Sequence, residues 1–430
     1  MRITRASWGL SAAALAALLA ACGGSGGGAG TGGAGTDEPP FTVPPPVYDV
    51  QYTPETVVVE ESALLSGDSS SGTYTFSESA LSAAGQQLAA GQVLLVAGRD
   101  LRRIDSVGGA SGGEVVVQTS EATLNEAIQD GTIEWVQPIR FDPGTGAPTL
   151  HLLTSEGRVP FRETSSNTLE ATVNTGPYAI TVSIEMNGAT ARVALTVEKS
   201  VGGGVKARFK AEGTLQQFKS ANRITYAGGQ LQEFSHQNQD LRGELDLSIT
   251  LAGSGNDALQ GFEFPAVLLE YPMLVGPIPV VLSVKALFVI NCVVPLEGSA
   301  EVSAKFTFDS ATGIHYGGTS VEVNGTAGTH QVVKNVAQTG AASAISVNYG
   351  IAFPRIEVGL LGKSIVPWAQ TSFLIGGFYQ PGVHACQEAK SSFIGAVGYD
   401  LSFLGLVDLG SGSKTLWQQD NVLLQVGSCT

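Results

Sequence analysis

The sequence has little charge and few of the residues that usually build catalytic or metal sites. Charged residues make up only 14% of its 430 positions, and it contains five histidines, four cysteines and three methionines. No pair of histidines has the spacing of a helical metalloprotease site, and no phosphate-binding or dinucleotide-binding glycine motif occurs. We therefore expect neither a metal ion nor a cofactor.

Basic residues are scarce relative to acidic ones. The chain has 23 Lys and Arg against 38 Asp and Glu, which gives a formal net charge of −15. Such a balance repels nucleic acid and anionic lipid headgroups. We expect no nucleic-acid partner, and any membrane contact has to come from attached lipid rather than from a basic surface.

Two short patterns resemble a catalytic motif and a metal site, but each is better explained by ordinary structure. Ser111 fits Gly-x-Ser-x-Gly, but that motif presents its serine between a strand and a helix, whereas the strand-like residues 114–117 follow here. A hairpin turn explains it better. His384 and Cys386 offer two metal ligands, but a disulfide at Cys386 would remove one of them. We expect no catalytic residue from these motifs.

The composition is typical of a mainly β protein. It has 55 glycines and 43% hydrophobic residues, and short β-branched runs alternate with Gly/Ser clusters. We predict a small N-terminal β module over residues 47–143 with one short helix, followed by a large antiparallel sandwich or barrel-like body over residues 144–430. The helix is expected at 124–129, where Thr123 and Glu126 form a capping box and Asp130-Gly131 ends it. A second, weaker helix is expected at 79–88.

Periodicity predicts individual strands in the body. Alternating apolar residues at 180–186 and 191–197 flank Asn187-Gly188, which predicts a hairpin with a type I′ turn. The apolar run 273–294 is long enough to suggest a membrane helix. It contains Pro277 and Lys285, however, and β-branched residues dominate it, so a long buried strand is favoured.

The N-terminus carries a targeting signal. Arg2 and Arg5 precede the apolar run 10–21, which ends in Leu19-Ala20-Ala21-Cys22. This ending resembles the lipobox of bacterial lipoproteins. The resemblance implies cleavage of residues 1–21, a diacylglycerol on the Cys22 thiol and anchoring in the cell envelope. Gly23 stands where an Asp would resemble the inner-membrane retention signal, so we expect the outer membrane if the source is Gram-negative.

Residues 22–46 follow as a lipidated cysteine and a tether. Residues 23–35 are almost wholly Gly, Ala, Ser and Thr, and prolines stiffen the rest. Of the remaining cysteines, Cys292 sits in an apolar run and is expected to be a buried thiol. Cys386 and Cys429 lie in polar settings of an exported chain, so we expect a disulfide between them.

No local motif identifies a ligand for the predicted β domain. The aromatic residues Trp135, Trp368 and Trp417, with Tyr316 and Tyr399, could contact a glycan, or they could pack in the core and at its rim. Residues 91–95, 101–104 and 119–124 resemble modules of uncharacterised secreted bacterial proteins, and this resemblance carries no activity. We expect a non-enzymatic envelope lipoprotein that binds glycan or protein or has a structural role. The alternatives are a tethered, glycosidase-like hydrolase with paired carboxylates and a carrier of apolar ligands.

Overall fold

A computed structural model describes most of the chain beyond its N-terminal segment. The described residues are 43–109, 112–141, 149–154, 157–165, 167–175, 178–200, 206–254, 257–259, 266–294, 297–328, 330–336, 340–341, 345–380, 385–406 and 411–427. The chain divides into two units, residues 1–42 and 43–430, and only the second is described below. The predictions for the signal, for residues 22–42 of the tether and for Ser111, His384 and Cys429 lie outside the described residues.

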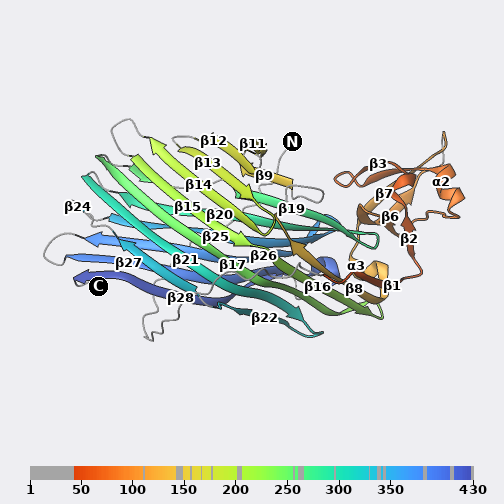
Figure 1. The fold of residues 1–430 in the computed structure, drawn as a ribbon. Helices are drawn as coiled ribbons and strands as arrows, with labels where there is room; N and C mark the ends of the chain where they lie inside the picture. The colour runs from red at the N-terminus through yellow and green to blue at the C-terminus, as the bar shows by residue number, and fades with distance from the viewer. Residues whose placement is uncertain are drawn as a thin grey trace. The chain divides into compact units, whose positions relative to one another are not determined.

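The second unit is built from three sheets (Figure 1). The path of the 13-stranded sheet is β1 (Val47–Tyr52), β8 (Ile128–Ile139), β16 (Phe218–Ala227), β17 (Gln230–Ser254), β15 (Lys206–Gln216), β14 (Thr190–Ser200), β13 (Tyr178–Met186), β12 (Thr168–Thr175) and β11 (Arg162–Ser165). In this sheet β21 (Glu297–Tyr316) also pairs with β17, and it carries β22 (Val321–Thr326), β23 (His330–Val336) and β24 (Gly340–Ala341).

The other two sheets are smaller. The nine-stranded sheet contains β10 (Gly157–Pro160), β9 (Thr149–Thr154), β19 (Ala266–Val275), β20 (Ile278–Val294), β25 (Ile345–Leu360), β26 (Lys363–Gln380), β27 (Cys386–Asp400) and β28 (Ser411–Gly427), with β18 (Asp257–Leu259) beside β20. The six-stranded sheet contains β2 (Thr56–Val59), β5 (Val93–Val96), β6 (Asp100–Val107), β7 (Glu114–Glu121), β4 (Thr73–Ser77) and β3 (Leu64–Asp68). The helical segments are α2 (Glu78–Ala83), α3 (Leu124–Ala127) and the 3₁₀ turns η2 (Glu61–Ala63) and η3 (Ser402–Leu404).

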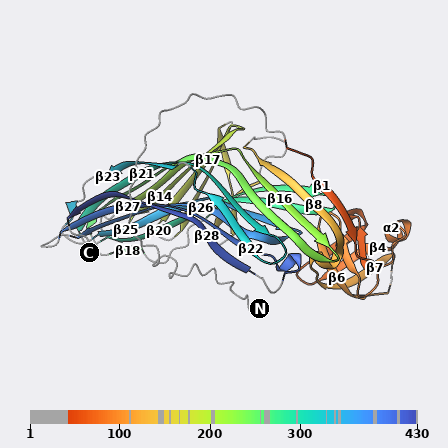
Figure 2. The same ribbon diagram turned by 90° about the horizontal axis from the view of Figure 1, so that it is seen from below.

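The core lies between the two larger sheets, whose long strands run alongside one another (Figure 2). Every second residue of β13 is buried, as Ile180, Val182 and Ile184 illustrate, and the residues between them are more exposed. Ring contacts join the sheets: the centroids of Phe306 and Phe373 are 5.2 Å apart. The predicted mainly β, antiparallel, sandwich-like fold is confirmed.

The segment around the predicted helix 124–129 differs in part from the expectation. The capping box of Thr123 and Glu126 is present, but α3 is only one turn long and continues directly into β8. Asp130 and Gly131 lie inside that strand rather than at a helix end. Gly131 has φ of +135°, and a Cβ there would lie 2.1 Å from the Asp49 carbonyl oxygen, so only glycine fits this close approach of β1.

The strand β8 links the two regions that the sequence divides at residue 143. It pairs with β16 along most of its length, so it belongs to the 13-stranded sheet rather than to the small module. The six-stranded sheet itself spans residues 56–121 and shares a core cluster with β8, because Val93 and Leu101 belong to the same cluster as Trp135. The two separate folding units at 47–143 and 144–430 stay a prediction.

Two further strand predictions are tested by the structure. β13 and β14 form the expected hairpin, but the turn is not type I′, because only Gly188 has positive φ. Asn187 instead uses its side-chain oxygen to accept the Thr190 backbone N–H at 3.0 Å. A turn at 276–277 interrupts the run 273–294: its first residues end β19, and the rest forms β20, the expected long strand, in which Val280, Leu282 and Val284 are buried. No helix among the described residues is both long and apolar enough to cross a membrane.

Cys386 begins β27 and is buried rather than exposed in a polar loop. Its sulfur is disulfide-bonded, and the partner is not among the side chains that the structure describes. The register places Cys386 opposite Gly427, two positions before Cys429 in the sequence. The Cys386–Cys429 pairing stays a prediction, and Cys292 lies in β20 as the apolar run suggested.

Candidate functional site

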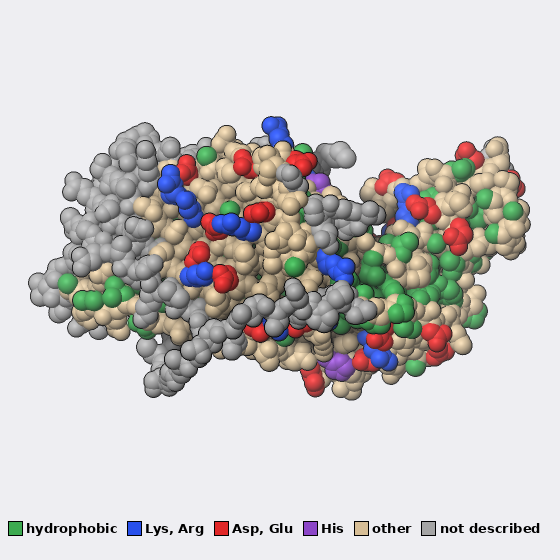
Figure 3. Space-filling view, viewed as in Figure 1, with side chains coloured by type: hydrophobic (Ala, Val, Ile, Leu, Met, Phe, Trp, Pro, Cys, Tyr) green, Lys and Arg blue, Asp and Glu red, His purple; other side chains and the backbone are tan. Residues whose placement is uncertain are grey.

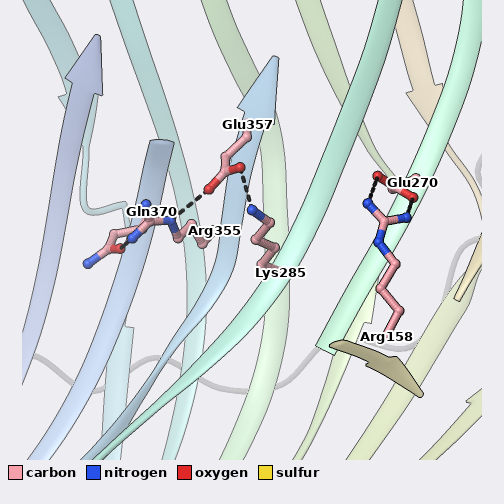
Figure 4. Close-up of polar contacts among 6 residues, drawn as sticks. All are labelled: Arg158, Glu270, Lys285, Arg355, Glu357 and Gln370. Carbon is pink, nitrogen blue, oxygen red and sulfur yellow. Dashed lines mark hydrogen bonds and ion pairs between the residues drawn. The ribbon is translucent and has the colours of Figure 1, made fainter. Parts of the chain in front are cut away.

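A network of charged side chains lies on the outward face of the nine-stranded sheet, and Figure 4 draws it. Glu357 on β25 accepts hydrogen bonds from two cations, from Lys285 Nζ at 2.5 Å and from Arg355 Nε at 3.1 Å. Arg355 also donates from Nη1 to the Gln370 side-chain oxygen at 3.4 Å, and Gln370 donates to the Ser372 hydroxyl at 3.1 Å. We call Lys285, Arg355, Glu357 and Gln370 the outer network.

Strand register explains why these residues meet. Lys285 on β20 lies opposite Arg355 on β25, and Arg355 lies opposite Gln370 on β26. Their neighbours Val284 and Ile356 point the other way into the core, which fixes the polar residues on the outward face. The sequence-distant side chains are therefore held in one row by three adjacent strands.

A second ion pair lies on the same sheet, two strands further along. Arg158 on β10 contacts Glu270 on β19 through both guanidinium nitrogens, at 3.0 and 3.4 Å (Figure 4). Glu270 is opposite Ser283, and Ser283 is opposite Glu357, so the two groups are neighbouring parts of one polar surface. This pair is neutral as a whole.

The outer network is far less exposed than the ion pairs on the other large sheet. The side chains of Lys285, Arg355 and Glu357 are between 12% and 17% exposed. In contrast, pairs on the outward face of the 13-stranded sheet are 40% to 57% exposed; they are Arg192–Glu212, Arg208–Glu198 and Lys305–Glu244. Figure 3 shows positive and negative side chains scattered over the surface in that view. The pairs on the 13-stranded sheet are ordinary solvated surface ion pairs, whereas the charges of the outer network are only partly solvated.

The outer network carries a positive charge in an acidic protein. Two cations share one carboxylate, and among the described residues no acceptor lies at Nη2 of Arg355. Burial lowers the pKa of the Arg355 guanidinium, while the charge of Glu357 opposes that shift. The arrangement can offer fixed guanidinium and ammonium donors to an anionic group, and such recognition needs donors held in place.

The three tryptophans expected as ligand-contact residues have different surroundings. Trp135 points inward from β8 and is fully buried in the core, so it is not a surface platform. The Arg355 guanidinium lies over the Trp368 ring, 5.4 Å from its centroid. A Cβ on Gly398 would lie 2.6 Å from the same indole, which shows that the ring packs on the glycine backbone. Trp368 therefore positions Arg355.

Trp417 is partly buried and packs against neighbouring residues. Its ring centroid is 5.9 Å from that of Phe393, and a Cβ on Gly395 would lie 2.3 Å from the indole. Tyr316 and Tyr399 are buried as well. Trp135, Tyr316 and Tyr399 are therefore not exposed platforms, whereas ligand contact by the partly buried Trp368 and Trp417 stays a prediction.

The described histidines do not assemble a metal or catalytic group. No cluster of three or more His, Cys, Asp or Glu residues suited to a metal ion occurs within the described part of the chain. Ser111 itself is outside that part, but β6 and β7, which flank it, pair as antiparallel neighbours. This pairing agrees with the hairpin interpretation of the glycine-rich segment.

His236 is instead part of a polar row in the interior. It is fully buried on β17, with Nδ1 2.8 Å from the Asn222 side-chain oxygen and Nε2 2.9 Å from the Asn238 side-chain nitrogen. Because an amide oxygen accepts and an amide nitrogen donates, these partners assign the neutral tautomer with the proton on Nδ1. Burial lowers the pKa of His236 to about 4.

This pKa predicts an acid-sensitive fold. The unfolded chain binds a proton at His236 near pH 6.5 and the folded chain does so only near pH 4, so folding stability falls as the pH drops through that interval. The loss at pH 4 should be about 3 kcal/mol, because one pKa unit corresponds to about 1.4 kcal/mol. Urea unfolding at pH 7, 5.5 and 4 measures it. A His236→Gln variant with an unchanged pH slope between 7 and 4 would refute this assignment.

Sequence reasoning missed the outer network, although a signal was present. Lys285 was noted only as an exception to a membrane helix, and Arg355 and Glu357 stand two apart in a strand of apolar residues. Charges at alternate positions of a mostly apolar strand mark one shared face, but the partner strand is set by long-range pairing. Comparison with family models, curated proteins and solved structures finds no match for this chain.

Proposed function

We propose that this chain is a cell-envelope lipoprotein with a non-enzymatic binding role, and that the outer network receives an anionic group of its ligand. The main support for this proposal is the low solvent exposure of the Lys285, Arg355 and Glu357 side chains, although they lie on an outward sheet face. Taking charged groups out of water costs free energy.

The charged donors of the outer network favour an acidic glycan over a neutral one as the ligand. The Arg355 guanidinium lies over the Trp368 ring, and among the described residues no acceptor lies at Nη2 of Arg355. An acidic glycan offers carboxylates that match a guanidinium and an ammonium. An acidic glycan therefore fits better than a neutral one.

Binding to acidic polysaccharide tests the proposal. The full mature chain with Cys22→Ser, exported through a signal that lacks a lipobox, provides an unlipidated protein for the assay. We expect retention on immobilised polygalacturonate, weaker retention at high salt and no retention on dextran. Release of sugar fragments from the polygalacturonate, lost on replacing one carboxylate, would support the tethered hydrolase instead.

Anchoring through Cys22 is the second part of the proposal. It rests on the lipobox-like ending Leu19-Ala20-Ala21-Cys22 and on the Gly/Pro-rich segment behind it. Two or three acyl chains anchor a protein stably, so the body needs no basic membrane-binding surface of its own. Outer-membrane placement follows from Gly23 if the source is Gram-negative.

A further inference from the structure

The core between the large sheets contains a polar row as well as apolar side chains. Four residues lie directly opposite one another on adjacent strands of the 13-stranded sheet and are all buried; in order they are Gln137 on β8, Ser220 on β16, Asn238 on β17 and Thr312 on β21. Four strands at about 4.8 Å spacing make this row about 14 Å wide. We call it the polar belt.

Several belt atoms have no hydrogen-bond partner within the described part of the chain. They are the Gln137 side-chain oxygen, the Asn238 side-chain oxygen and, one step along β21, the Ser310 hydroxyl. Asn238 uses its nitrogen to donate to the Thr312 hydroxyl at 3.0 Å, which leaves its oxygen unpaired. Each such buried group costs roughly 1–3 kcal/mol, so native proteins rarely leave several together.

The facing sheet adds unpaired groups, and Thr371 lies opposite Gly395, which lies opposite Trp417. Phe308 on β21 and Phe373 on β26 have ring centroids 4.9 Å apart, and Ser310 and Thr371 each follow two positions away on the same inward faces. Among the described residues, the fully buried Thr371 hydroxyl has no hydrogen-bond partner, and neither does Trp417 Nε1. Trp417 approaches Gly325 on β22, the residue opposite Thr312, which places the indole beside the belt.

The unpaired groups define what they can bind. Amide oxygens accept, hydroxyls do both and the indole N–H donates, and none of them is charged. A partner must therefore be uncharged and must both donate and accept hydrogen bonds. Phe308 stands two positions before Ser310, and its ring contacts that of Phe373, which stands two positions after Thr371, so the partner also meets an apolar wall there.

We infer that the polar belt, with Ser310 and Thr371, is an internal binding site for an uncharged amphiphile that carries hydroxyl groups. Its hydroxyls pair with the belt while its apolar part lies against the phenylalanine rings. The site is separate from the outer network, which faces outward from the nine-stranded sheet and binds anions. Either proposal stands if the other fails.

Binding of monooleoylglycerol to the unlipidated full mature chain tests this inference. We expect a one-to-one complex by native mass spectrometry and a higher Tm with the probe. Thr371→Val and Ser310→Ala should each weaken binding about tenfold, because each removes one hydrogen bond. Thr172→Val, which changes an exposed hydroxyl near Thr181, is the control and should bind normally.

Two results would overturn the inference. One is the absence of a complex with the unsubstituted chain. The other is unchanged probe affinity in both Thr371→Val and Ser310→Ala.

Discussion

Replacing Glu357 by Gln should lower the free energy of unfolding by about 3 kcal/mol, although the residue lies on an outward sheet face. Glu357 is the shared partner of Lys285 and Arg355, and all three side chains are at most 17% exposed. The substitution leaves two poorly solvated cations without a carboxylate. Chemical denaturation at pH 7 measures the change.

The control for this prediction is Glu212→Gln. Glu212 pairs with Arg192 on the outward face of the 13-stranded sheet, where both side chains are about half exposed. Solvent screens such a pair, so the loss should be below about 1 kcal/mol. Equal losses in the two variants would show that the outer network is an ordinary surface ion pair.

Glu357→Gln should raise the affinity for an anionic ligand, although it lowers the stability of the fold. Without Glu357, the donors of Arg355 and Lys285 lose their internal acceptor and the network gains one unit of positive charge. The affinity of the unlipidated chain for polygalacturonate should rise several-fold at low salt, while its stability falls. A variant that loses both stability and affinity would indicate that Glu357 itself contacts the ligand.

Cys22→Ser in the natural precursor should abolish stable membrane attachment. If Cys22 carries the acyl chains, the unsubstituted protein partitions into the detergent phase and its intact mass includes the lipid. The serine variant carries no acyl chain and should appear in the aqueous phase. Its folded body should be unaffected, because residues 1–42 form a unit apart from residues 43–430. An unlipidated and freely soluble unsubstituted product would contradict the lipoprotein assignment.

The fold could be predicted from local patterns where one face of a strand is buried. Ile180, Val182 and Ile184 alternate with polar residues, and β13 follows that pattern residue by residue. The capping box at Thr123 and Glu126 was also readable, because it depends on contacts within one turn. Predictions failed where distant contacts set the geometry. Gly131 was expected to end a helix, but it lies in β8, where β1 approaches it closely.

The candidate site could be predicted only in part from the sequence, for the same reason. Lys285 and Arg355 are 70 positions apart, and only the β20–β25 register makes them neighbours. Trp368 was singled out as a possible ligand contact, but its position beneath the Arg355 guanidinium depends on the pairing of β25 with β26. His236 gave no signal, because its two amide partners lie on β16 and on its own strand.

The most direct test of the proposed anion-binding face compares two arginine variants of the unlipidated full mature chain. Titration with polygalacturonate should show that Arg355→Gln binds at least about tenfold more weakly than the unsubstituted chain, since it loses a charge-assisted contact. Arg208→Gln, which removes a cation from the solvated pair with Glu198, should bind normally. Circular dichroism should show both variants folded. Equal affinities for the two variants, with both folded, would contradict the proposal that the outer network receives the ligand.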